Sequence, residues 1–171
     1  NIGSSTAHRI GIGTSAPTEQ LSITGNFALP TTASSSGVTS GVIMQDDKTL
    51  LHTFSGGDSN LFLGQDAGNF TMSGEKNIGI GRDALSVNTS GSQNIALGDK
   101  ALADNTTGYA NNAFGVSSLT NNTTGIANTA LGGASLQNNE TGSGNAAFGI
   151  YAGAGASGTG SSDINSSTLF G

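Results

Sequence analysis

Few side chains in this chain could support metal or acid–base chemistry. The two histidines are His8 and His52, and the absence of cysteine removes the usual zinc-binding patterns. A ring of symmetry-related His52 side chains could hold a metal ion or an anion, whereas the plainer interpretation is a strand-surface or interface residue. Asp46 and Asp47 are adjacent, and neighbouring residues of a strand or turn point apart, which favours a solvated hairpin tip.

Acidic residues also recur in three neighbouring segments, at Asp66, Asp83 and Asp99. They could form a weak cation-binding stripe, but we expect a solvated outer face. The IGIG segment at 10–13 lacks the Gly-Lys-Ser/Thr of a phosphate-binding loop, and the calcium-binding GGxGxDxUx repeat does not occur. No nucleophile, base and oxyanion pocket can be assembled, so we expect no enzyme activity, no cofactor and no metal.

Composition narrows the possible partners. The net charge is −6 with only five Lys and Arg among 171 residues, which disfavours binding to nucleic acid. No apolar run approaches the ~20 residues that cross a bilayer, so we expect no membrane insertion. With 28 glycines, 34% hydrophobic residues and 9% charged residues, the chain is typical of a repetitive β architecture.

The elements that would position any site follow a 17-residue repeat. Each of six units begins with Asn, and a Gly occupies position 5 of every unit. The asparagines are Asn60, Asn77, Asn94, Asn111, Asn128 and Asn145, and the glycines are Gly64, Gly81, Gly98, Gly115, Gly132 and Gly149. A seventh unit is imperfect, because Gly171 follows Gly149 by 22 residues.

Four columns of the repeat contain small or apolar side chains. Position 4 is always bulky, and we predict that it forms the core row: Leu63, Ile80, Leu97, Phe114, Leu131 and Phe148. Position 3 is Ala or Gly except for Phe62, which would let another backbone approach closely. Position 8 is Ala or Ser, and position 9 supplies a second inward row, Leu85, Leu102, Leu119 and Leu136.

The glycines and turns of each unit predict two short strands joined by two corners. The glycine at position 5 suggests a sharp corner or a positive φ, and NTSG, NTTG or NETG gives a tight turn. Seventeen residues are too few for a helical hairpin, and no 3.6-residue period is present. We therefore predict an all-β fold, a parallel β-solenoid or β-roll of about six coils with equivalent residues ~4.8 Å apart.

Stacked coils give the asparagine at position 1 a structural role. Side-chain amides directly above one another can bond along the column as an Asn ladder, which we favour over a ligand-binding role. The NTT and NTS turns also match the N-glycosylation signal, but only a eukaryotic secretory route would use it.

One chain buries few bulky side chains per coil, so packing against other copies would help to offset the entropy of ordering the backbone. We therefore expect a homo-oligomer, a homotrimer in particular.

The chain ahead of the repeats divides into three parts. We predict a strand and hairpin module at residues 1–29, with a turn at 15–18, and a linker at residues 30–41. A β-hairpin follows at 42–58, then the repeats at 59–161. Because the residues before the repeats do not follow the 17-residue period, we expect the hairpin to belong to a separate module joined to the solenoid near Gly57-Asp58. Residues 162–171 are an irregular last repeat or a connection to a missing C-terminal part.

Two groups of motifs resemble a known class of proteins. RIGIGTSAPTEQLSITGN is similar to the GIGT…P…L…GN segment of long phage tail fibres and related bacterial surface proteins. The N-x-A-[LF]-G units resemble the head or shaft repeats of the same fibres and, more loosely, the N-x-x-A-I-G β-roll of trimeric autotransporter adhesin heads.

The resemblance implies a trimeric, extracellular, elongated attachment protein, a virion tail fibre in the first place and a bacterial surface adhesin or filament as the alternative. A host cell-surface glycan or protein would be its partner. A monomeric ice-binding or ligand-binding solenoid, with Thr106-Thr107 and Thr123-Thr124 stacked in columns, is a further alternative, disfavoured because these pairs lie in turns.

Overall fold

The computed structural model describes residues 3–4, 10–12, 21–23, 43–45, 48–52, 60–155 and 168–171. The chain divides into two compact units, Asn1–Thr31 and Thr32–Gly171. The predicted linker at 30–41 and His8 lie outside the described residues.

The first unit contains a three-stranded sheet of β1 (Gly3–Ser4), β2 (Ile10–Ile12) and β3 (Leu21–Ile23). β1 pairs with β2 in the antiparallel direction, whereas β2 and β3 pair in parallel. The hairpin predicted from the turn at 15–18 is therefore wrong for these two strands. Turn-forming residues show that the chain changes course but do not fix the direction in which the next strand pairs. The turn itself lies outside the described residues.

The second unit is built on a nine-stranded sheet that begins with the predicted hairpin. β4 (Ile43–Gln45) pairs with β5 (Lys48–His52) in the antiparallel direction. β5 then pairs with β6 (Leu61–Leu63), also antiparallel. The hairpin is thus the first part of the solenoid sheet, and the expectation that it belongs to a separate module is wrong, because its hydrogen bonds continue into the first coil.

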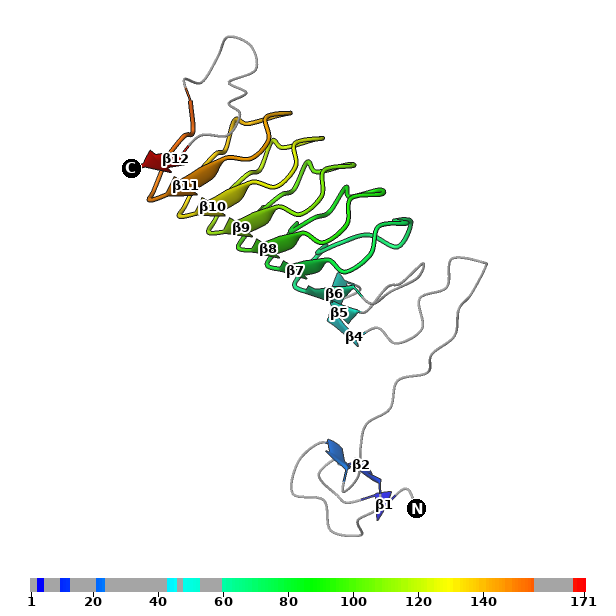
Figure 1. Ribbon diagram of the computed structural model, residues 1–171. Helices are drawn as coiled ribbons and strands as arrows, with labels where there is room; N and C mark the ends of the chain where they lie inside the picture. The colour runs from blue at the N-terminus through cyan, green and yellow to red at the C-terminus, as the bar shows by residue number, and fades with distance from the viewer. Residues whose placement is uncertain are drawn as a thin grey trace. The chain divides into compact units, whose positions relative to one another are not determined.

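From β6 onward the strands pair in parallel, each with the strand of the next coil. This confirms the parallel β-solenoid, with about five turns (Figure 1). Equivalent residues are 17 apart in register, as Leu61↔Ile78 shows. The later strands are β7 (Ile78–Ile80), β8 (Ile95–Leu97), β9 (Asn112–Phe114), β10 (Thr129–Leu131), β11 (Ala146–Phe148) and β12 (Thr168–Phe170).

The last strand resumes the stacking despite the longer spacing. Ala147 pairs with Leu169 and Phe148 with Phe170, so Gly171 follows its strand as Gly149 follows β11. The additional residues of this unit lie within 156–167, outside the described residues.

The interior of the coils is lined by positions 3, 8 and 9. Position 3 is fully buried in all six units, and Leu85, Leu102, Leu119 and Leu136 at position 9 are 0% exposed. The core row predicted at position 4 is wrong. Leu63 is 40%, Ile80 37%, Leu131 49% and Phe148 38% exposed, and Leu97 and Phe114 are half-buried. Because successive residues of a strand face opposite sides, a buried position 3 places position 4 outside.

The narrow coil interior explains which side chain faces inward. A large residue at position 3 is accommodated only where its neighbours are small, as in the first coil. A Cβ added to Gly68 would lie 2.6 Å from the Phe62 ring, and one added to Gly79 would lie 2.7 Å from it. Phe62 thus replaces the leucine that coils two to five supply from position 9.

The corner glycines have the positive φ that the sequence predicts, between 121° for Gly149 and 144° for Gly98. A Cβ at any of them would collide with the carbonyl group of the glycine in the next coil, as at Gly64, where the distance to the Gly81 oxygen would be 2.7 Å. Both the φ and the contact require glycine.

Candidate functional site: ladders and an exposed apolar stripe

The predicted Asn ladder at position 1 is present and buried. The six asparagines are at most 1% exposed. The Asn94 Oδ1 accepts bonds from the Asn111 backbone N–H at 3.0 Å and from its Nδ2 at 3.2 Å. The Asn111 Nδ2 also donates to the Gly125 carbonyl across the coil at 2.8 Å. Each amide therefore joins two coils and both sides of one coil.

A second Asn ladder runs beside the first, through the NTSG, NTTG and NETG turns, at Asn88, Asn105, Asn122 and Asn139. The Asn105 Nδ2 donates to the Asn88 Oδ1 at 2.8 Å and to the Gly108 carbonyl at 3.0 Å. From the sequence, these residues are predicted only to form turns. The signal was the same 17-residue recurrence, here of the Asn that begins NTSG, NTTG and NETG.

Threonine hydroxyls in this turn bond to the backbone of the next coil. The Thr106 Oγ1 donates to the Thr123 carbonyl at 3.0 Å, and the Thr123 Oγ1 donates to the Glu140 carbonyl at 3.0 Å. These hydroxyls take part in stacking, so Thr106 and Thr123 do not form a flat exposed array.

His52 closes the first end of the coil interior. Its side chain is 2% exposed, and its ring centroid lies 4.9 Å from that of Phe62 and 4.4 Å from that of Phe70. The Nε2–H donates to the Ala67 carbonyl at 2.8 Å. Burial lowers the pKa of His52, and the Ala67 bond opposes this only in part. Both expected roles, a strand-surface residue and a ring around an axis, are wrong, because the ring points into the core.

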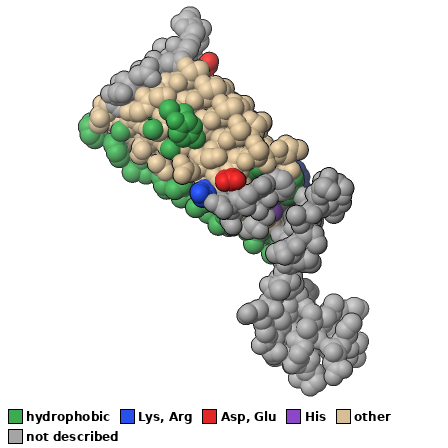
Figure 2. Space-filling model, turned by 45° about the vertical axis from the view of Figure 1, so that its right-hand side comes forward, with side chains coloured by type: hydrophobic (Ala, Val, Ile, Leu, Met, Phe, Trp, Pro, Cys, Tyr) green, Lys and Arg blue, Asp and Glu red, His purple; other side chains and the backbone are tan. Residues whose placement is uncertain are grey.

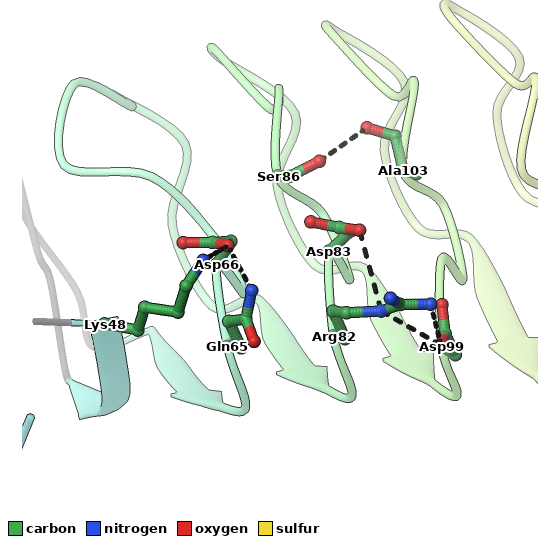
Figure 3. A network of polar contacts seen from close by, with 8 residues as sticks. All are labelled: Lys48, Gln65, Asp66, Arg82, Asp83, Ser86, Asp99 and Ala103. Atoms are coloured by element: carbon green, nitrogen blue, oxygen red, sulfur yellow. Dashed lines mark hydrogen bonds and ion pairs between the residues drawn. The ribbon is translucent and has the colours of Figure 1, made fainter. Parts of the chain in front are cut away.

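The acidic residues singled out in the sequence lie on the surface and pair with cations (Figure 3). Lys48 Nζ lies 3.5 Å from the Asp66 carboxylate, and the Arg82 guanidinium donates to the Asp99 carboxylate at 2.6 Å. Asp83 lies 3.9 Å from Arg82. The predicted solvated outer face therefore describes them better than a cation-binding stripe. Among the described residues, no group of three or more His, Asp and Glu side chains could hold a metal ion.

The feature left without an intramolecular role is an apolar row on the outer face of the sheet. We define the outer stripe as the bulky residues at position 4 and their equivalent on β12: Leu63, Ile80, Leu97, Phe114, Leu131, Phe148 and Phe170. Figure 2 shows hydrophobic side chains in a row along one edge of the coil stack. Phe170 is 81% exposed, and its ring stacks on that of Phe148 with centroids 5.9 Å apart. A row this long and apolar is typical of a protein interface.

The described part of the chain contains no helix long and apolar enough to span a membrane. Comparisons of the chain with protein-family models, with curated proteins and with solved structures find no match. The fold and the outer stripe are thus the features that bear on function.

Proposed function

We propose that this chain is a structural and adhesive segment of a trimeric extracellular fibre, in the first place a phage tail fibre that attaches to host cells. The single observation that supports the proposal is the outer stripe, which runs along a stack of coils. A stack whose buried amides and corner glycines repeat in every coil is stiff along its axis, as a fibre segment must be.

The exposed apolar row supports assembly in particular. Coils two to five each hide small side chains and one leucine inside, whereas the bulky residue at position 4 faces outward. Burying those residues between copies would add the apolar burial that one thin coil cannot supply by itself. The motif resemblance to tail fibres adds the trimeric state and the extracellular setting.

Assembly is tested by comparing two substitutions of matched exposure. Leu131, in the stripe, is 49% exposed, and Val87, outside the strand, is 46% exposed. We expect trimers of the native chain and of Val87→Asp in mass photometry, and monomers of Leu131→Asp with an unchanged β-sheet circular dichroism spectrum. A native chain that stays monomeric at micromolar concentration would contradict the assembly proposal.

Attachment is tested with labelled native and Leu131→Asp chains on whole bacterial cells. We expect binding by trimers and a loss of at least ~10-fold in the monomeric variant, because three linked sites bind with higher avidity than one. Equal binding by monomer and trimer would contradict an assembly-dependent adhesive role. Negative-stain microscopy of native particles separates a tail fibre from the alternative, a filament or adhesin on a cell envelope.

A further inference from the structure

The strands β4 and β5 lie at the first end of the coil stack, ahead of β6 (Figure 1). We call these two strands the hairpin cap. β5 pairs antiparallel with β6, at Leu51↔Leu63 and His52↔Phe62, whereas every later pair of this sheet is parallel. The hairpin cap therefore covers the strand edge at which the repeated coils begin, and an uncovered edge can pair with another chain.

The hairpin cap lies outside both Asn ladders, because the chain has no Asn at residues 27–59. The Leu50 carbonyl accepts the Gly64 N–H at 2.8 Å. Lys48 lies 3.5 Å from Asp66, but both side chains are about half exposed, and ion pairs in contact with water contribute little. Segments outside the main hydrogen-bond network open at a smaller free-energy cost than the body of a fold. The cap is thus the part of this sheet that can open while the coils stay stacked.

His52 joins the hairpin cap to the coil interior. Its ring is buried against Phe62 and Phe70, and its Nε2–H donates to the Ala67 carbonyl at 2.8 Å. The second ring nitrogen, Nδ1, is also buried and has no hydrogen-bond partner among the described residues. Protonation of Nδ1 would create a charged N–H donor in this apolar site, and such a group costs free energy unless it is bonded or hydrated. Opening of the cap would bring the ring into water.

Charged side chains do not hold the ring in place within the described part of the chain. Those of β5 and the first coil are Lys48, Asp66, Glu75 and Lys76. The His52 Nε2 bonds to the Ala67 carbonyl instead, and Nδ1 bonds to none of the described residues. Burial lowers the pKa of His52, and the Ala67 bond opposes this only in part. The positive charge of a protonated ring would therefore have no bonded carboxylate there to offset its burial.

We propose that His52 is an acid-sensitive latch: the neutral ring holds the hairpin cap on the first coil, and the protonated ring releases the cap while the later coils remain stacked. Release uncovers the Phe62 ring and the edge of β6. The inference goes beyond the proposed function and does not depend on assembly, because His52 faces the interior of a single coil stack. Acid would thus change one end of the solenoid without unfolding the rest.

The sign of the effect follows from the two states of the cap. In the released cap His52 has its ordinary pKa of 6.5, and in the closed cap burial lowers the pKa. The closed cap is therefore most stable above pH 6.5 and loses stability relative to the released cap as the pH falls below that value. Between neutral pH and about pH 5, the ratio of released to closed caps should rise at least ~10-fold.

Hydrogen exchange at two equivalent amides measures cap release. The Gly64 N–H donates to Leu50 of the cap, and the Gly115 N–H donates to Leu97 of a neighbouring coil, both at 2.8 Å. In the native chain we expect the protection of Gly64, corrected for the intrinsic exchange rate, to fall at least ~10-fold between about pH 7.5 and about pH 5. Low urea concentrations should leave the protection of Gly64 unchanged and lower that of Gly115, because cap release exposes little surface. Protection of Gly64 that does not fall in acid overturns the latch.

His52→Phe tests whether this ring is the latch. The variant keeps an aromatic side chain that cannot be protonated, so the acid-induced loss of protection at Gly64 should shrink to less than about twofold. His8→Gln is the control and should respond as the native chain does. Because His52→Phe also lacks the Ala67 bond, NMR titration of the native chain gives a second measurement. There the loss of protection at Gly64 should follow the protonation of the His52 imidazole.

The outcomes separate this inference from the proposed function. Equal protection and equal urea dependence at Gly64 and Gly115 would mean that the cap and the coils open together, which overturns local release. An acid-induced loss that persists in His52→Phe overturns the role of the ring. Leu131→Asp should show the same acid response as the native chain, and a response confined to the native chain overturns an intramolecular latch. A monomeric native chain contradicts the proposed assembly and leaves the latch in place.

Discussion

At the residue scale, this protein depends on polar side chains that are buried and bonded. The Asn111 amide illustrates this, with donors and acceptors engaged above, below and across its coil. Two buried side-chain atoms are exceptions, because they have no hydrogen-bond partner among the residues that the structure describes: the His52 Nδ1 and the Ser118 Oγ. Buried polar atoms without partners cost free energy of folding, so both positions give testable predictions.

The stability of the solenoid should depend on the protonation of His52. Its pKa is lowered by burial from the ordinary 6.5, so below that pH the unfolded chain binds a proton that the folded chain excludes. The free energy of unfolding should therefore fall as the pH drops below 6.5 toward the pKa of His52 in the folded chain. Above pH 6.5 the titration of His52 should leave the free energy of unfolding unchanged. Urea unfolding between about pH 7.5 and about pH 5 measures this.

The control for His52 is His52→Phe, which keeps a ring against Phe62 and Phe70 and removes the titration. Its unfolding free energy should change less over the same pH range than that of the native chain. His8→Gln separates the contribution of the other histidine. An equal pH dependence in His52→Phe would contradict the role of the buried ring.

Ser118 and Ser135 form a matched pair at position 8. Both are buried, but the Ser135 Oγ donates to the Gly132 carbonyl at 2.8 Å. Ser118→Ala should raise the free energy of unfolding by about 1 kcal/mol, because it removes an unbonded hydroxyl, while Ser135→Ala should lower it by about 1 kcal/mol. Urea titration of both variants measures these changes. If Ser118→Ala lowered the free energy of unfolding as much as Ser135→Ala does, the result would contradict an unbonded Ser118 hydroxyl.

At the element scale, one coil is closed by a corner glycine on one side and an Asn turn on the other. Four buried leucines at position 9 adopt a positive φ, for example 56° at Leu85, which is uncommon for this residue type. The stacked hydrogen bonds and the full burial of the leucine side chain hold that backbone in place. Each coil thus depends on contacts with its neighbours.

The corner is tested by two glycine substitutions in adjacent coils. Gly115 has a φ of 138°, and a Cβ there would meet the Gly132 carbonyl group, whereas a Cβ on Gly133 would meet only the Val116 oxygen at 3.8 Å. Gly115→Ala should lower the free energy of unfolding by about 3 kcal/mol or more, and Gly133→Ala by less than about 0.5 kcal/mol. Thermal and urea unfolding measure both; similar losses would contradict the steric account.

The Asn ladder is tested by a nearly isosteric change. The Asn111 Nδ2 lies 2.8 Å from the Gly125 carbonyl oxygen and 3.2 Å from the Asn94 Oδ1. Asn111→Asp removes both N–H donors of this amide and places a carboxylate oxygen against those two acceptors. We expect a loss of about 3 kcal/mol or more in unfolding free energy. Asn112→Asp is the control, since that side chain is half-buried on the outer face. A tolerated Asn111→Asp would contradict the ladder's contribution.

At the scale of the whole molecule, the outer stripe links stability to assembly. If copies cover the stripe, the melting midpoint of the native chain should rise with protein concentration, because association stabilises the folded state. Leu131→Asp should abolish this dependence and leave a folded chain with a constant midpoint. Differential scanning calorimetry over a 100-fold range of concentration, about 1 to 100 µM, measures both.

The sequence by itself determined the 17-residue period, the corner glycines, the position-1 Asn ladder and the parallel solenoid. These follow from local rules, since stacking repeats identical residues and a positive φ needs glycine. The tertiary structure decided which strand face is inside. Alternation says that Ala113 and Phe114 face opposite ways, but only the width of the coil shows that Ala113 fits within and Phe114 must face out. The burial of His52 and the parallel pairing of β2 with β3 were likewise decided by packing between distant segments, which local sequence patterns do not encode.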